Sequence, residues 1–117
     1  MPFSSAEPTK GVSHTRGHSI TPSLNIDSLD RPIVAWADAS QGNYEIYLRL
    51  FSGQWLDHFR SASVGGISNS TGPSLNPRLA IRKLAEPNAD GLTQEMCVSY
   101  SEANSTSLEI VMRCSAF

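Results

Sequence analysis

Short apolar runs separated by polar turn residues follow one another along this 117-residue chain. The runs over 20–26, 32–38, 44–51 and 54–60 carry β-branched and aromatic residues, and Asp, Ser, Gly or Pro residues separate them. Such runs predict β-strands, because branched and aromatic side chains fit a pleated, half-buried surface. No stretch shows a convincing helical period. The pattern therefore predicts an all-β chain whose strands form antiparallel meanders.

The same pattern occurs twice in the chain. Residues 66–81 match residues 11–26 at seven of sixteen positions, with a separation of 55 residues. Residues 97–115 match residues 33–51 at five positions with a separation of 64, because nine extra residues lie between the two blocks. The second and third strands are apolar on both faces, so we expect both faces to be covered. Such strands in repeats of this length are typical of stacked β-propeller blades.

The run VAWADASQGNYEIYLRLFSGQW, preceded by PSLNID, resembles a bacterial β-propeller repeat of the form VAWxDxSxGNYEIYxR. Such repeats are grouped with the BNR/Asp-box or sialidase-like propellers. The match covers residues 11–55 well and residues 66–114 in degraded form. The chain has Asp30 where the family pattern has Gly, and it lacks the Asp-box S-x-D-x-G-x-x-W. The resemblance therefore implies the blade fold more strongly than it implies sialidase chemistry.

The repeats begin and end out of phase with the strands. Residues 1–10 resemble the end of a fourth strand, residues 11–65 hold a whole unit, and residues 66–117 stop before their fourth strand. We expect an N-terminal strand in 1–10 that completes a C-terminal blade, a first blade in 11–65 and a second in 66–117. Two four-stranded antiparallel blades leave apolar faces in water, so we predict a homo-oligomeric ring, with a trimer favoured. A piece of a longer propeller is the alternative.

The two cysteines lie on neighbouring strands of the second unit. The hairpin register sets Cys97 opposite Cys114, where the first unit has the apolar Ile33 and Leu50. Two small buried side chains would suit these positions, and so would a cross-strand disulfide in an oxidising compartment. We expect no metal site, because no C-x-x-C motif or nearby histidine accompanies the pair.

Acidic residues face each other across the same loop of both units. Asp38 lies opposite Glu45, and Glu102 lies opposite Glu109. Paired carboxylates can hydrolyse glycosides. A catalytic pair is needed once, whereas this pair recurs, which favours a structural role. No nucleophile elbow, P-loop, dinucleotide fingerprint or metalloprotease motif is present. We therefore predict a protein that is not an enzyme and uses no cofactor.

The leading functional hypothesis is a binding or assembly module, with glycans as the candidate ligand. Some small propellers are lectins, in which aromatic rings stack on sugars and Arg or Glu binds the hydroxyl groups. On this basis the candidate ligand-binding residues are Tyr44, Glu45, Arg49 and Trp55. The alternatives are a structural subunit that docks onto a larger protein complex and a fragment of a sialidase-like glycoside hydrolase.

Charge and hydropathy exclude further classes of partner. The chain has 9 Lys and Arg against 11 Asp and Glu, without the basic excess of a nucleic-acid binder. No apolar run is long enough to cross a bilayer, so we expect no membrane insertion. Residues 1–10 lack the apolar core of a signal peptide. The resemblance leans toward a secreted or cell-surface protein, but the sequence does not assign a compartment.

Overall fold

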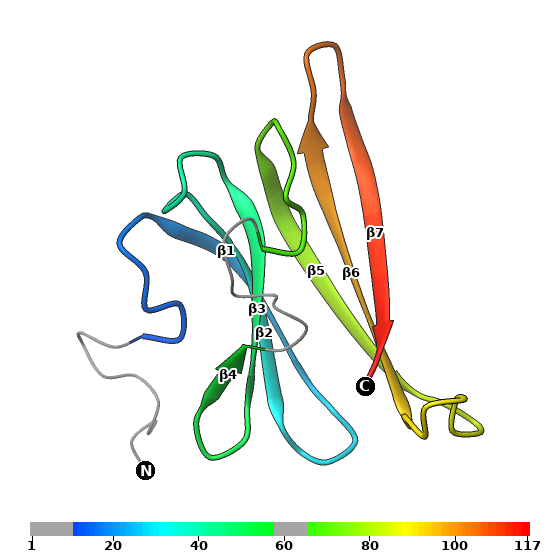
Figure 1. The fold of residues 1–117 in the computed structure, drawn as a ribbon. Coiled ribbons are helices and arrows are strands. Elements are labelled where there is room, and N and C mark those ends of the chain that lie inside the picture. The colour runs from blue at the N-terminus through cyan, green and yellow to red at the C-terminus, as the bar shows by residue number, and fades with distance from the viewer. Residues whose placement is uncertain (1–10, 58–65) are drawn as a thin grey trace.

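Two antiparallel sheets make up the computed structural model, which describes residues 11–57 and 66–117 (Figure 1). This part of the chain contains strands and no helix, so the all-β prediction is confirmed. No helix of the described residues is long and apolar enough to cross a membrane. The first sheet has the order β1-β2-β3-β4 and the second β5-β6-β7. The strands are β1 (Ser19–Ile26), β2 (Pro32–Asp38), β3 (Glu45–Phe51), β4 (Trp55–Asp57), β5 (Ser74–Lys83), β6 (Gln94–Ala103) and β7 (Leu108–Ala116).

The strands of the first sheet lie where the apolar runs predict them. β1 ends at a turn in which the Asp27 carboxylate accepts hydrogen bonds from the backbone N–H groups of Leu29 and Arg31, both at 2.9 Å. Such side-chain bonds to the backbone are the reason why Asp favours turns. β4 covers only the start of the predicted run 54–60. The rest of that run and the expected strand in residues 1–10 lie outside the described residues.

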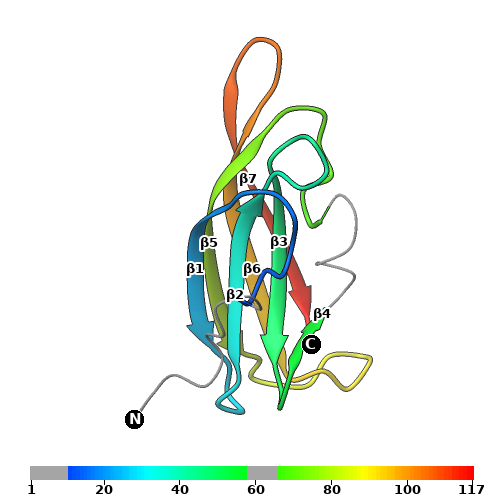
Figure 2. The same ribbon diagram turned by 90° about the vertical axis from the view of Figure 1, so that its left-hand side faces the viewer.

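The two sheets stack face to face, and the second lies behind the first in Figure 2. Successive residues of a strand point to opposite faces, and the β2–β3 register pairs Ala35 with Leu48 and Ala37 with Ile46. These side chains therefore share one face of the first sheet. They pack against the second sheet, where the core is formed by Leu79, Met96, Val98, Tyr100 and Phe117. The core lies between the sheets and joins them.

The two central strands of the first sheet are buried on their outer face as well, as predicted. Trp36 on β2 and Tyr47 on β3 are both buried on this face. Their rings stack with centroids 6.0 Å apart. β2 and β3 are thus buried on both sides, whereas in the second sheet β6 alternates and β7 is largely exposed.

The first strands of the two sheets share unusual backbone features. β1 and β5 each carry a register shift in their pairing with the next strand, between Ile20 and Ser23 and between Leu75 and Arg78. Left-handed conformations are costly for residues other than glycine. They nevertheless occur at positions 55 residues apart: His14 (φ 47) and Asn69 (φ 39), and Thr21 (φ 51) and Asn76 (φ 55). The segments before and within β1 and β5 therefore follow the same backbone path.

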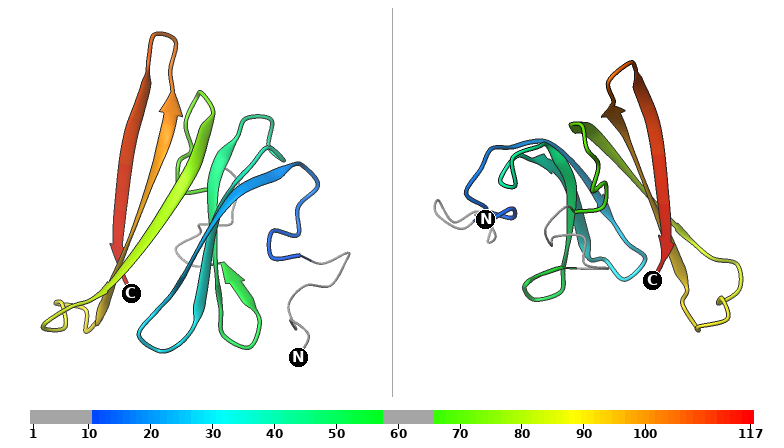
Figure 3. Two further views of the ribbon diagram at one scale, coloured as in Figure 1. Left: turned by 180° about the vertical axis from the view of Figure 1, so that it is seen from behind. Right: turned by 45° about the horizontal axis from the view of Figure 1, so that its top comes forward.

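The hairpin between β5 and β6 is longer than its counterpart in the first sheet. Its loop, residues 84–93, holds no helix and is closed by a backbone hydrogen bond from Leu84 N to Thr93 O at 2.8 Å. Inside the loop, the Asn88 side chain accepts hydrogen bonds from Asp90 N and Leu92 N. The extra residues therefore form an ordered projection at one end of the second sheet, drawn in yellow in both views of Figure 3.

Candidate assembly surfaces

The four residues proposed to bind a ligand do not converge on one pocket. Tyr44 packs against the core between the sheets. Arg49 lies on the opposite face of β3, where its Nη1 donates a hydrogen bond to Val12 O at 3.0 Å. Trp55 on β4 pairs with Phe51 at the end of β3 and makes an edge-to-face contact with it, with ring centroids 5.2 Å apart. Arg49 and Trp55 therefore share the outer face of the first sheet, since Trp55 pairs with Phe51, two residues after Arg49, whereas Tyr44 packs against the core on the other side.

Glu45, the fourth of these residues, is buried and holds a neighbouring segment against the edge of β3. Its carboxylate accepts hydrogen bonds from the hydroxyl of Ser68, from Ser70 N at 3.0 Å and from Asn43 Nδ2 at 2.7 Å. Ile46 N in turn donates to Ser68 Oγ at 2.8 Å. Two of these partners, Ser68 and Ser70, thus come from residues 66–74, the segment that leads into the second sheet.

Asp38 plays a corresponding part for the segment that leads into the first sheet. Burial alone would raise the pKa of its carboxyl, but hydrogen bonds from Ser40, Thr15 and Ser19 lower that pKa to about 2. The Thr15 and Ser19 hydroxyls lie 2.5 and 2.7 Å from Oδ2. Asp38 is therefore ionised at neutral pH and ties residues 11–19 to their own sheet.

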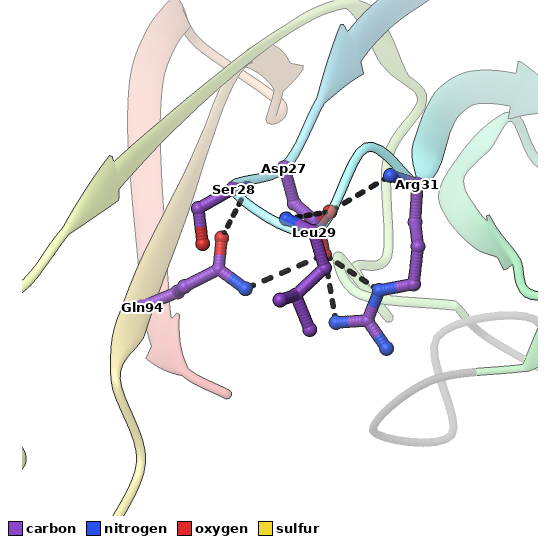
Figure 4. A network of polar contacts seen from close by, with 5 residues as sticks. All are labelled: Asp27, Ser28, Leu29, Arg31 and Gln94. Carbon is purple, nitrogen blue, oxygen red and sulfur yellow. Dashed lines mark hydrogen bonds and ion pairs between the residues drawn. The ribbon is translucent and has the colours of Figure 1, made fainter.

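A third polar network joins the two sheets at one end (Figure 4). Asp27 is buried, and Arg31 Nη2 lies 2.7 Å from its Oδ2. Gln94 on the second sheet donates from Nε2 to the same oxygen at 3.4 Å and accepts from Ser28 N at 2.8 Å. Burial raises the pKa of Asp27, but the bonds to Arg31, Leu29 and Gln94 outweigh this effect and lower it. All its oxygens face protein donors, which indicates a structural tie.

One outer surface of the molecule is apolar and open to solvent along β7. We call it the β7 face: Leu108, Ile110, Met112 and the disulfide between Cys97 and Cys114, which the β6–β7 register places on the same side. Ile110 is 76% exposed and Met112 is 67% exposed. The residues 64 positions earlier, Ile46 and Leu48, are 0% and 1% exposed in the core. Apolar patches of this kind mark association surfaces.

The opposite outer surface is apolar along β1. We call it the β1 face: Ile20, Leu24, Ile26 and an adjoining hollow. Leu24 is 64% exposed, whereas Leu79, 55 residues later on β5, is 9% exposed because the first sheet covers it. The hollow has a volume of about 240 Å³ and is lined by Val12, Ser13, Ser19, Ile20, Pro22, Val34 and Trp36.

The outer edges of β3 and β7 also differ, because other parts of the chain bind the edge of β3 but not that of β7. β4 pairs with one end of β3, from Arg49↔Asp57 to Phe51↔Trp55, and residues 66–74 bind its other end. β7 pairs with β6 on one side and, among residues 11–57 and 66–117, with no strand on the other. Unpaired strand edges offer backbone groups to another chain.

Comparison with family models, curated proteins and solved structures gave no match to this chain. The sequence predicts open apolar faces but does not identify Leu24, Ile26, Ile110 or Met112 as their members. The signal for them lay in the aligned repeats, because these positions are apolar in both units. Ser68 was also missed, although it is identical to Ser13 in that alignment.

Proposed function

We propose that the chain is a non-enzymatic assembly module, in which two propeller-type blades bind further blades through the β1 and β7 faces. The observation that carries this proposal is the match between the open faces and the interface inside the chain. Ile46 and Leu48 on the first sheet pack over Leu79 and its neighbours on the second. In the aligned repeats, Ile110 and Met112 of the second unit match Ile46 and Leu48 of the first. Leu24 of the first unit matches Leu79 of the second.

The internal interface therefore supplies a template for an external one. When the β7 face of one copy covers the β1 face of another, each buried side chain meets the kind of neighbour that its counterpart already has. Ile110 and Met112 would fill the hollow beside Trp36, as Ile46 and Leu48 fill the space beside Tyr100. Fully burying one such side chain stabilises by roughly 1.5–3 kcal/mol.

An interface between two different faces joins copies head to tail. Head-to-tail contacts close into a ring when the rotation per copy fits, and otherwise give an open filament. With two blades per chain, three copies form a six-bladed ring, which is the assembly we favour. A closed ring leaves neither apolar face in water, which is the physical reason for closure.

The polar groups of the described residues support a role in binding over catalysis. Glu45 and Asp27 are engaged by protein donors, and the low pKa of Asp38 suits a permanent anion better than a group that exchanges protons. The glycan hypothesis rests on the family resemblance. Docking onto a larger complex would use the same apolar faces.

The mass in solution tests whether copies assemble. We expect light scattering to give about 38 kDa for the purified chain, three times its 12.7 kDa. Ile110→Lys should leave a folded monomer, because it places a charge at the centre of the β7 face. Leu29→Lys is the matched control, since Leu29 is equally apolar and 66% exposed but lies in the turn after β1. A wild-type monomer at high concentration would contradict the proposal.

A mixing experiment tests the head-to-tail geometry. Ile110→Lys destroys the β7 face and spares the β1 face, whereas Leu24→Lys does the reverse. Each variant alone should be a monomer, and an equimolar mixture should form dimers of about 25 kDa, twice 12.7 kDa, and nothing larger. If one variant still self-associates, the interface joins two identical faces and the head-to-tail geometry is wrong.

A further inference from the structure

We infer that the free edge of β7 binds residues 12–19 of a second copy, with the Glu109 carboxylate as its anchor. The inference rests on the proposed head-to-tail assembly and adds a backbone-recognition site to it. It identifies both the strand edge and the segment that occupies it. The evidence is that β3 and residues 66–74 already form such a site within the chain. The repeat places the matching strand edge on β7 and the matching segment in residues 12–19.

The complete version lies between β3 and residues 66–74. Ile67 N donates to Ile46 O at 2.6 Å, and the Ser68 hydroxyl bridges Ile46 N and the Glu45 carboxylate. Further along, Ser70 N donates to the same carboxylate and Ser74 N donates to Tyr44 O at 2.7 Å. The segment thus binds both the backbone of the strand edge and its one acidic side chain.

The acceptor half of this site is repeated on β7. The register pairs Ser101 with Ile110 as it pairs Ala37 with Ile46, and in antiparallel sheets such equivalent pairs direct their backbone groups alike. The N–H and C=O of Ile110 therefore point away from β6, toward the open edge. Glu109 lies one residue before Ile110 and is exposed. Glu109 has no hydrogen bond or ion pair to any of the residues that the structure describes.

The donor half is repeated in residues 12–19. Val12, Ser13, Thr15 and Ser19 stand where Ile67, Ser68, Ser70 and Ser74 stand in the later segment. Each segment is fixed to its own sheet by the same bond, Ala39 N to His18 O at 3.0 Å and Ala103 N to Pro73 O at 2.9 Å. The left-handed residues His14 and Asn69 also coincide. Residues 12–19 thus share these two backbone features with the bound segment 67–74, and a segment that is held in place before it binds has a lower entropic cost of binding.

A glycine provides independent support for this pairing. A Cβ on Gly66 would clash with Ile46 O, so the close approach of the segment to β3 requires glycine. Gly11 occupies the equivalent position, yet a Cβ there would meet nothing within 4 Å. The fold of one described chain gives no reason for glycine at 11. A close approach of residue 11 to Ile110 O of a second copy would require glycine at this position, as the approach of Gly66 to Ile46 O does.

Gly11→Ala and Glu109→Gln test the inference, because both positions are open in the single chain. Sedimentation equilibrium should show copy–copy affinity at least about tenfold weaker for each variant, the loss expected for a hydrogen bond to a charged group or for a steric clash. Their melting temperatures under monomeric conditions should equal that of the wild type. Glu86→Gln, an exposed carboxylate in the loop 84–93, is the control and should assemble normally.

Hydrogen exchange gives a second measurement that does not depend on affinity. The Ile110 amide should be protected from exchange in the assembled wild type. In the Leu24→Lys variant, which keeps Ile110 but should be a monomer, the same amide should exchange freely. If the wild type assembles and Ile110→Lys prevents it, while Gly11→Ala and Glu109→Gln assemble normally, the edge site is wrong and the stacking of faces stands. If the wild type stays monomeric, the proposed function itself is wrong.

Discussion

The two sheets have related sequences, yet only the first has central strands, β2 and β3, that are buried on both faces. Ile46 and Ile110 are the same residue at matching positions of β3 and β7, one in the core and the other almost fully in solvent. The two strands themselves are alike, because β3 pairs with β2 in the same register in which β7 pairs with β6. The difference lies in what covers them. The apolar residues of a strand therefore do not determine by themselves whether the strand is buried, because burial also depends on the segments that pack against it.

The largest contrast should come from removing this isoleucine in each sheet. Ile46→Ala leaves a cavity in the core and should lower the free energy of unfolding by about 2–5 kcal/mol. Ile110→Ala removes an exposed side chain and should change it by no more than about 0.5 kcal/mol. Urea unfolding at a concentration where the chain is monomeric measures both values. Equal losses would mean that β7 is already buried within a single chain.

The disulfide should give the next largest effect, because only the second sheet has one. Cys97 and Cys114 close a loop with a sequence separation of 17, and losing such a crosslink costs about 3 kcal/mol. Adding dithiothreitol should therefore lower the urea midpoint of the wild type. The double variant Cys97→Ser/Cys114→Ser should start at the lower midpoint and ignore the reductant. A wild type that also ignores it would show that the crosslink contributes nothing to stability.

Acid should produce a smaller effect that originates in the first sheet. The pKa of Asp38 is about 2 in the folded chain against 3.8 ordinarily, so its ionised form stabilises the fold above about pH 4. That stability, about 2 kcal/mol, should be lost as the pH falls through 4 toward 2. Urea unfolding between pH 6 and pH 2 measures the slope. Asp38→Asn should flatten it, and an unchanged slope in that variant would assign the effect to other carboxylates.

The strands of the fold could be predicted from the sequence because their signals are local. Alternation and turn residues place β1, β2 and β3 within one residue of their observed bounds, and hairpin register brings Cys97 opposite Cys114. The same alternation also shows that Tyr44 and Arg49 face opposite ways, an argument that the choice of candidate ligand-binding residues did not use.

The polar ties could not be predicted, because their partners are distant in sequence. Ser68 and Ser70 reach Glu45 only after the chain has crossed from one sheet to the other. Gln94 meets Asp27 across 67 residues. No local pattern distinguishes these partners from other polar residues in loops. The exposure of Leu24 and Ile110 is likewise a property of missing neighbours, which a single strand does not encode.

The ordered loop 84–93 belongs to the second unit alone, and this sets the valency of any ring that the chain builds. Blades with and without the projection would alternate around the circumference. A three-copy ring would carry three such loops, evenly spaced on one rim, although it would contain six blades. The number of chains, rather than the number of blades, would then decide how many contacts the particle displays to a multivalent target.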